Sequence, residues 1–308
     1  LHDKVQQAVF FLVAENERKE NHLAIGRLLL QKASDAGFVD RVLSIMDHFN
    51  RSLELIGDSE ERLMLARYNL EAGRKARAAA AYESALRYFR YGRELLSDDS
   101  WHSTYKLSYD LYIELAQAEY LSGNADAAEE LFNIVIQNSA TELERAGIYS
   151  LKIILYASMG RYDEAVNTGI TALRNLGVSI PVQPKKLDFI KEFLIFKWNM
   201  KNKRIEDLTN LPEIDDPEQR MIAELLSRLS TVTMTSHFDL YNYIIIKTGN
   251  HSTKHGNSFM ALVGYFGYSF IVGDIFGDYR SSERYARVCI DLAEKYGHSA
   301  SKCIIYFV

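Results

Sequence analysis

Cysteine is scarce in this chain, which argues against a protein stabilised by disulfide bonds. Only two cysteines, Cys289 and Cys303, occur among the 308 residues. Small secreted domains that depend on disulfides carry several cysteines at regular spacings, so these two are expected to be core thiols of a cytoplasmic protein. No secretory signal is visible at the amino end.

Proline is equally scarce and is confined to one window, at Pro181, Pro184, Pro212 and Pro217. Proline breaks helix interiors, so the long proline-free stretches on either side of this window predict nearly continuous helix. No run rich in Val, Ile and Thr alternates between turn residues in the way a strand does. The sequence therefore predicts an all-α protein, with the proline window separating two helical groups.

The chain also has no large excess of charge of either sign. The net charge is −5 and hydrophobic residues make up 47% of the chain. This balance gives no global electrostatic reason to bind nucleic acid and predicts a folded core rather than disorder. The chain begins at Leu1 rather than at methionine and finishes on the apolar run Cys303–Val308, so we expect a fragment of a longer polypeptide.

One long uncharged stretch, from Gly256 to Gly273, has a borderline length for a membrane span. Polar residues and glycines interrupt it, and Gly264 and Gly267 would let a helix approach a neighbour closely. We therefore predict a tightly packed helix here and no membrane span.

Motifs for chemistry are missing as well. Neither common phosphate-binding glycine loop, nor the Gly-x-Ser-x-Gly elbow, nor the kinase catalytic-loop motifs occur. The best metal candidates are His251 and His255 on one helix face, with His237 upstream, but zinc needs further ligands. Asp216 before Pro217 is interpreted as a helix cap rather than as half of a catalytic pair with Asp215. We predict no catalytic, metal or cofactor-binding residues and no enzymatic activity in this chain.

What the sequence does contain is a helix–glycine–helix unit that appears twice in register, at residues 109–138 and 146–176. Each copy has large apolar residues before a central glycine, Gly123 or Gly160, and mostly small or apolar residues at matching positions after it. A looser third copy at about 60–96 carries Ala85, Phe89 and Gly92 at the corresponding spacings. This is the tetratricopeptide-type pattern, in which one hairpin must stack on its neighbours to bury its apolar face.

We therefore predict an α–α superhelix, a tetratricopeptide-like right-handed solenoid of antiparallel helix pairs. The expected divisions are residues 1–32, the repeats at 33–177, a connector with one helix at 178–217, and a second helical repeat group at 218–308. Within the last group the helices are predicted at about 218–235, 238–254, 257–274 and 278–296. At the start of the first hairpin, Gly57 is expected to end the preceding helix and Ser59 to cap the next.

First-helix residues of the repeats would line a concave groove that binds a peptide or a neighbouring domain. The predicted groove residues are Arg67, Leu70, Arg74, Arg77, Asp110, Ile113, Gln117, Tyr120, Ser150, Ile154 and Ala157. Residues 61–94 hold eight Arg or Lys against four Glu, whereas residues 107–144 hold eight Asp or Glu and no Arg or Lys. This contrast predicts ion pairs between neighbouring repeats or, as the alternative, docking patches for charged partners.

Four segments also resemble a known family. They are Leu1–Ala8, His22–Leu30, Asn69–Ala76 and Glu119–Asn124. They resemble the central region of very large bacterial signalling proteins, in which a serine/threonine-kinase-like domain precedes a predicted ATPase of the STAND type. A long helical repeat region follows the ATPase, often with a GAF sensor and a histidine kinase after it.

The resemblance implies a role and no reaction. Residues 1–32 would be the end of the ATPase's accessory helical arm, and the rest would be the repeat region. ATP and Mg²⁺ would bind only in neighbouring domains, because the family's nucleotide-binding motifs lie outside this chain. The expected partners are the neighbouring ATPase and kinase domains or other signalling proteins, and the chain would be a non-enzymatic scaffold or sensor in the cytoplasm. The oligomeric state is not predicted.

A small-molecule receptor is the main alternative function. The second helical group is rich in aromatic residues, which would line an enclosed pocket. These residues are Trp198, Phe238, Tyr241, Tyr243, Phe259, Tyr265, Phe266 and Tyr268. A closed apolar cavity with converging polar groups would favour this receptor, whereas an open groove would favour the scaffold. A third alternative, an enzyme with an unfamiliar site, would be favoured by a metal bound at His251 and His255.

Overall fold

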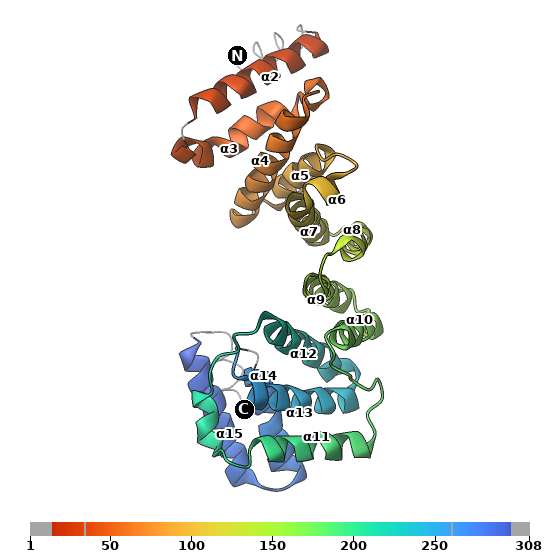
Figure 1. Cartoon of the computed structure of the whole chain (residues 1–308), viewed down its shortest axis with the longest axis vertical. Coiled ribbons are helices and arrows are strands. Elements are labelled where there is room, and N and C mark those ends of the chain that lie inside the picture. Colours follow the sequence, from red (N-terminus) through yellow and green to blue (C-terminus); the bar gives the residue numbers. More distant parts are fainter. Residues whose placement is uncertain (1–13, 34, 260, 297–308) are drawn as a thin grey trace, which may run out of the picture. The chain divides into compact units, whose positions relative to one another are not determined.

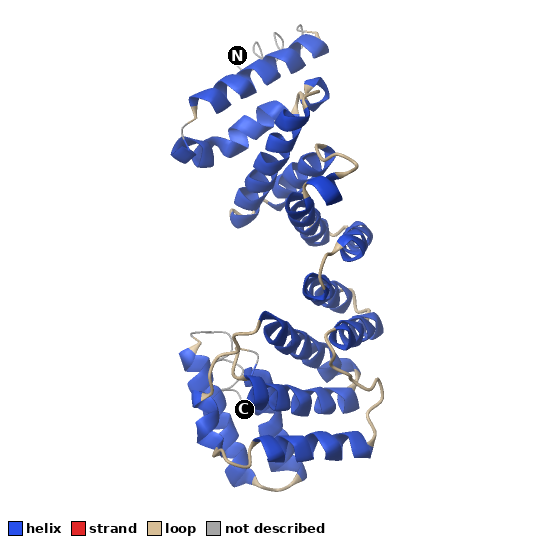
Figure 2. Ribbon diagram, in the orientation of Figure 1, coloured by secondary structure: helices blue, strands red, loops and turns tan. Residues whose placement is uncertain are grey.

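The computed structural model describes residues 14–33, 35–259 and 261–296, and the protein over these residues is all-α (Figures 1 and 2). An isolated parallel bridge between Glu213 and Asn257 is the β contact recorded there, and no strand occurs in this part of the chain. The predicted fold class is confirmed. The expected features within residues 1–13 and 297–308, including Leu1–Ala8 and Cys303, lie outside the described residues.

The chain divides into two compact units, Leu1–Asn138 and Ser139–Val308. The first unit contains α2 (Glu15–Lys32), α3 (Asp35–Asn50), η1 (Leu53–Leu55), α4 (Ser59–Ala78), α5 (Tyr82–Glu94), α6 (Ser100–Ser103), α7 (Tyr105–Leu121) and α8 (Ala125–Asn138). Pairs of consecutive helices, α4 with α5 and α7 with α8, pack as hairpins, and α5 packs on α7. Stacked hairpins of this kind are the building plan of a helical repeat.

The second unit begins with another hairpin and continues into a larger cluster of helices (Figure 1). Its elements are α9 (Glu142–Ser158), α10 (Tyr162–Asn175), α11 (Lys186–Asn199), η2 (Ile205–Asn210), α12 (Pro217–Ser236), α13 (Phe238–His255), α14 (Ala261–Phe270), the π-helical turn η3 (Ile271–Ile275) and α15 (Tyr279–Lys295). α12 packs on α9 and α10, and α13 packs on α11, α12 and α14.

The three sequence copies share one turn geometry. Gly123 and Gly160 have φ angles of +84° and +72°, which is the left-handed region that glycine adopts without strain. In the looser copy Ala80 takes this position with φ +58°. The same backbone hydrogen bond closes all three turns, from Asn124 N to Glu119 O at 2.9 Å and, equally long, from Arg161 to Tyr156 and from Ala81 to Ala76. The predicted hairpin register is confirmed.

The two-unit division differs from the one expected from the proline window. The units divide between the two clearest repeats, and the proline-containing segment belongs to the second unit. The reason is that α12, beyond the prolines, buries Leu225, Leu226 and Leu229 in the same core as Val166 and Ile170 of α10. Proline ends helices, but it does not prevent the helices on either side from sharing a core.

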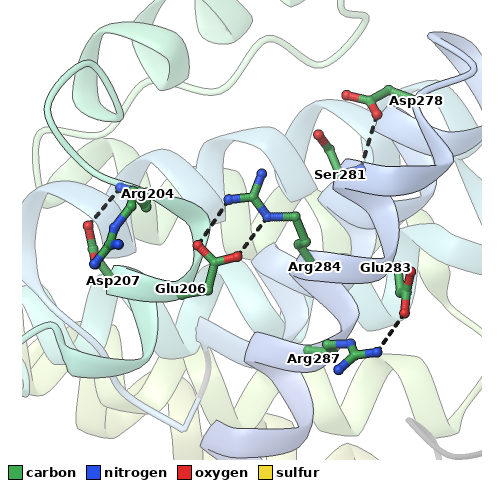
Figure 3. A network of polar contacts seen from close by, with 8 residues as sticks. All are labelled: Arg204, Glu206, Asp207, Asp278, Ser281, Glu283, Arg284 and Arg287. Atoms are coloured by element: carbon green, nitrogen blue, oxygen red, sulfur yellow. Dashed lines mark hydrogen bonds and ion pairs between the residues drawn. The ribbon is translucent and has the colours of Figure 1, made fainter.

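Polar contacts also join the proline-containing segment to the last helix (Figure 3). Arg284 of α15 donates to both carboxylate oxygens of Glu206 in η2, at 2.7 and 2.9 Å. This hydrogen bonding lowers the pKa of Glu206 to about 2. Asp278 accepts from the Ser281 amide at 3.1 Å and caps the start of α15. These side chains are largely exposed, so their contacts add little to the free energy of unfolding. Their main effect is to hold η2 at one position along α15.

The uncharged stretch after α13 forms a closely packed helix, as expected. A Cβ on Gly264 would lie 2.7 Å from the Gly249 backbone nitrogen, and one on Gly267 would lie 2.4 Å from Ile245. α14 and α13 therefore cross at contact distance. Within the described residues, no helix has the length and apolar character needed to cross a membrane.

One predicted cap is wrong. Gly57 does not have a positive φ, and Asp58 rather than Ser59 caps α4 by accepting from the Glu61 amide at 2.8 Å. Asp58 precedes a serine and two glutamates, so more than one residue suits the cap position. The cap predicted at Asp216 is confirmed, because its carboxylate accepts from the Glu218 amide at 2.8 Å in front of Pro217.

Candidate functional site

Two basic residues of the predicted groove, Arg74 and Arg77, are paired with acidic residues of α7 in the same unit. Arg74 Nε lies 2.8 Å from Glu114 Oε1 and its Nη2 lies 3.5 Å from Asp110 Oδ2. Arg77 also pairs with Glu114, whose side chain is buried. Arg90 pairs with the buried Glu119 at 2.7 Å. The ion pairs predicted between neighbouring repeats are confirmed, and these arginines serve to join α4 and α5 to α7.

The remaining groove residues are divided between the two units. Arg67 is exposed, and Leu70 is buried in the first unit. Five residues are half-buried: Ile113, Gln117, Tyr120, Ile154 and Ala157. Ser150 is buried in the second unit, where its hydroxyl donates to Glu224 at 2.7 Å. Partner binding by this set therefore stays a prediction.

The aromatic residues of the second helical group mostly form a core. Tyr265 is fully buried and Tyr268 is 3% exposed, whereas Trp198 and Phe238 are 74% and 68% exposed. Tyr268 also lines a hollow of about 400 Å³ with Phe193 and Phe276, whose rings stack 4.9 Å apart. Where the sequence predicts an enclosed aromatic pocket, the structure thus has a small recess beside a packed core.

A larger cavity lies elsewhere in the second unit and has a polar lining. It measures about 770 Å³, within the range of small-molecule sites. Residues from the loop after α10 and from α11, α12 and α13 line it. The polar and charged residues in its lining are Ser179, Asp188, Lys191, Glu192, Asn199, Gln219, Tyr243, Lys247, Asn250, His251, Lys254 and His255.

Glu192 is a buried carboxylate on the α11 side of this cavity, only 3% exposed. Lys247 Nζ lies 2.7 Å from its Oε1, and the Tyr243 hydroxyl donates to the same oxygen at 3.2 Å. Asn250 Nδ2 donates to Glu192 Oε2 and to the Glu192 carbonyl, both at 2.8 Å. Three side chains of α13 at helical spacing thus anchor one acid of α11, which fixes this wall of the cavity.

Two residues that line the cavity, Asn250 and His251, each have a buried acceptor atom without a hydrogen-bond donor. Both Nδ2 hydrogens of Asn250 are used, which leaves its Oδ1 as an acceptor, and that atom is buried without a partner. His251 Nε2 lies 3.1 Å from Gln219 Oε1, which only accepts, so Nε2 carries the hydrogen and Nδ1 is an acceptor. Nδ1 is also buried without a partner. Unpaired buried acceptors cost free energy unless a ligand or water donates to them.

His251 is neutral near pH 7. Burial lowers its pKa to about 4, with further lowering by His255 and by Lys254 and Lys247. The folded state therefore releases this proton at a lower pH than the unfolded state, whose histidine titrates near 6.5. Between these values the unfolded chain binds more protons, so stability falls as pH is lowered from about 6.5 towards 4.

We predict that this loss reaches about 2 kcal/mol at pH 5 for the wild-type second unit. The variant His251→Phe keeps a ring beside His255 but removes the titrating group, so it should lose less stability between pH 7.5 and pH 5. Guanidinium denaturation of both proteins at the two pH values measures the difference. Equal losses in the two proteins would show that His251 is not the group responsible.

The histidine pair shows no metal-site geometry beyond its shared helix face. The rings of His251 and His255 stack with centroids 4.8 Å apart, and His237 instead contacts Asp163 at 3.1 Å. Within the described residues no group of three or more His, Cys, Asp or Glu side chains is arranged to hold a metal ion. The polar lining of the cavity offers hydrogen bonds and charge pairing to a bound molecule.

An apolar stripe on α11 is the other feature of this unit that sequence reasoning missed. Leu187, Ile190, Leu194 and Trp198 recur at helical spacing and are 54–77% exposed. The exposed charged residues along and beside this helix are all lysines: Lys185, Lys186, Lys191, Lys197 and Lys201. The periodicity was readable in the sequence. However, Phe189, Phe193 and Phe196 make the opposite face apolar too, so the pattern alone does not tell which face is buried.

Comparison with known proteins gives one informative relationship. No protein-family model matches the chain. It is similar to Hybrid signal transduction histidine kinase G of Dictyostelium discoideum, with 26% identity over 234 residues, covering 68% of this chain. The chain spans only 7% of the length of that kinase. The similarity therefore concerns a segment of a much larger signalling protein.

Proposed function

We propose that the chain is a non-enzymatic, tetratricopeptide-like scaffold and sensor segment of a large cytoplasmic signalling kinase. In this proposal the parent carries serine/threonine-kinase-like, STAND-type ATPase and histidine kinase domains, and ATP and Mg²⁺ bind in those domains. The observation that carries the proposal is the similarity to a segment of a hybrid signal transduction histidine kinase. The stacked helical hairpins support it, because such repeats act mainly by binding other protein segments.

The α11 stripe is the contact surface that we propose for this role. Four large apolar side chains stand exposed in one row and lysines border them. Such a face fits an amphipathic helix with acidic flanks, because apolar residues would be buried at the centre and opposite charges would pair at the rim. We propose that a neighbouring kinase or ATPase domain of the same polypeptide supplies this helix. Binding that differs between the off and on states would then shift the parent between them.

The test is a pull-down with residues 1–308 as bait and the separately expressed kinase and ATPase domains of the parent as prey. We predict that Leu194→Ser combined with Trp198→Ser reduces capture at least tenfold. These side chains are 60% and 74% exposed, so the double variant should keep the melting temperature of the wild type. The matched controls are Leu121→Ser in α7 and Met234→Ser in α12, which are 52% and 55% exposed and lie outside the stripe.

Three results would contradict this surface. The first is capture that the double variant retains. The second is self-association of the chain, measured by light scattering, that the double variant abolishes, because the stripe would then bind a second copy. The third is sedimentation with anionic lipid vesicles that depends on the same two residues. Charge reversal of Arg74 and Arg77 is a poor alternative test, because these residues hold the buried Glu114.

A small-molecule receptor is the second candidate function, and the cavity between α11, α12 and α13 favours it. Its polar, partly charged lining differs from the closed aromatic pocket expected from the sequence. In this proposal the two functions belong to one input module, in which ligand occupancy of the cavity affects the contact made by the neighbouring stripe, because Lys191 and Ile195 of α11 line both.

A further inference from the structure

Residues that line the cavity of about 770 Å³ have hydrogen-bond acceptors for which the protein supplies no donor. Asn250 is only 6% exposed, and its Oδ1 lies buried without a donor while its Nδ2 is committed to Glu192. The next residue, His251, likewise presents a buried Nδ1 acceptor without a donor. Two adjacent residues of the lining thus carry buried acceptors that no protein donor satisfies, which favours a bound molecule rich in hydrogen-bond donors.

The neutral state of His251 also favours a ligand that donates hydrogen bonds. Burial lowers its pKa to about 4, so at pH 7 the ring carries one hydrogen, which Nε2 donates to Gln219 Oε1 and which leaves Nδ1 as an acceptor. The groups that face this region are His255, Lys247 and Lys254 on α13, Gln219 on α12, and Asp188, Lys191 and Glu192 on α11. Lys247 is the donor of this set nearest to the buried acid, and it is already paired with Glu192 at 2.7 Å.

The charge of the lining adds a second requirement. Glu192 is matched by Lys247, and Asp188 accepts the Lys185 amide at 2.8 Å at the start of α11. Lys191 and Lys254 are both exposed, line the cavity from two different helices, and make no ion pair within the described part of the chain. Two cations beside a polar cavity favour an anionic group on the ligand.

We propose that this cavity binds a small hydroxylated organic anion, such as a sugar phosphate or a hydroxycarboxylate. Its anionic group pairs with Lys191 and Lys254, and its hydroxyl groups hydrogen-bond with polar side chains of the lining, Asn250 and His251 among them. This inference rests on the receptor function given above as the second candidate and names its ligand class. It does not depend on the four apolar residues of the α11 stripe, although Lys191 lies beside both the stripe and the cavity.

The experiment is isothermal titration of the chain with probes that separate the two requirements. Glucose 6-phosphate, glycerol 3-phosphate and gluconate carry both hydroxyl and anionic groups, whereas glucose and inorganic phosphate each carry one kind. We predict that at least one probe of the first group binds tenfold or more tightly than both glucose and phosphate. The double variant Lys191→Gln with Lys254→Gln should weaken this binding at least tenfold, and Lys201→Gln, an exposed lysine outside the lining, should not.

The variant His251→Phe tests the buried acceptor. This variant should also weaken binding, and its melting temperature shows whether the fold is kept. If His251→Phe does not fold, the lysine variants still test the proposal, because they alter only exposed residues. Three outcomes overturn the proposal: no binding by any of the three combined probes, equal binding of inorganic phosphate, or binding that the lysine variants leave unchanged. The titration uses the chain alone and the pull-down uses no small molecule, so each can fail without the other.

Discussion

Replacing Gly264 by alanine is expected to destabilise the second unit by about 3 kcal/mol, the upper end of the usual cost of overpacking. Its Cβ would lie 2.7 Å from the Gly249 nitrogen and 3.0 Å from the Thr248 carbonyl carbon. Both are backbone atoms of α13, so no side-chain rotation relieves the contact and the two helices must move apart. That movement would loosen the core around Tyr265, which is completely buried in α14.

Gly147→Ala is the matched control, since Gly147 is also a helical glycine of the second unit. The nearest atom to its new Cβ would be the Met221 methyl at 3.8 Å, an ordinary van der Waals distance. Alanine is the better helix former, so this variant should gain about 0.5–1 kcal/mol. Guanidinium denaturation followed by Trp198 fluorescence in a Trp101→Phe background reports on the second unit. Similar midpoints for the two variants would show that α13 and α14 do not cross closely.

The helices and hairpins of this protein follow from local patterns in the sequence. Gly123 and Gly160 mark turns because a left-handed residue must end each first helix, and Asp216 with Pro217 marks a helix start because both suit its first turn. Ala80 shows the limit of this reasoning. It adopts the same left-handed conformation without being glycine, so the absence of a glycine does not exclude this turn.

The cavity could not be predicted from local patterns in the sequence. His251 was noticed as a metal candidate and Tyr243 as an aromatic residue, but the lining combines a loop and three helices that are distant in the sequence. Glu192 looks like an ordinary helix-surface acid until α13 packs on α11 and encloses it. The ion pairs of Arg74 and Arg77 with α7 were more accessible, because successive repeats are neighbours in space and their opposite charges are visible in the sequence.

Lys247→Met is expected to destabilise the second unit by about 3 kcal/mol, comparable to the effect of Gly264→Ala. The methionine keeps the apolar stem of the side chain but removes the cation 2.7 Å from Glu192 Oε1. The carboxylate would remain buried with hydrogen bonds from Tyr243 and Asn250 but without an opposite charge. A single buried charge costs far more than the pair, because its desolvation is no longer offset.

Lys254→Met is the matched control on the same helix, because Lys254 is exposed and makes no ion pair within the described residues; its cost should stay within about 0.5 kcal/mol. Adding Glu192→Gln to Lys247→Met removes the unpaired charge; the amide oxygen can still accept from Asn250 Nδ2, and the amide NH2 can donate to the Tyr243 hydroxyl. The double variant should therefore be more stable than Lys247→Met by about 1 kcal/mol or more. If Lys247→Met costs no more than Lys254→Met, the Glu192 carboxylate does not depend on this cation. The wall of the cavity would then be held by hydrogen bonds alone, and α11 would be freer to move against α13 when a ligand binds.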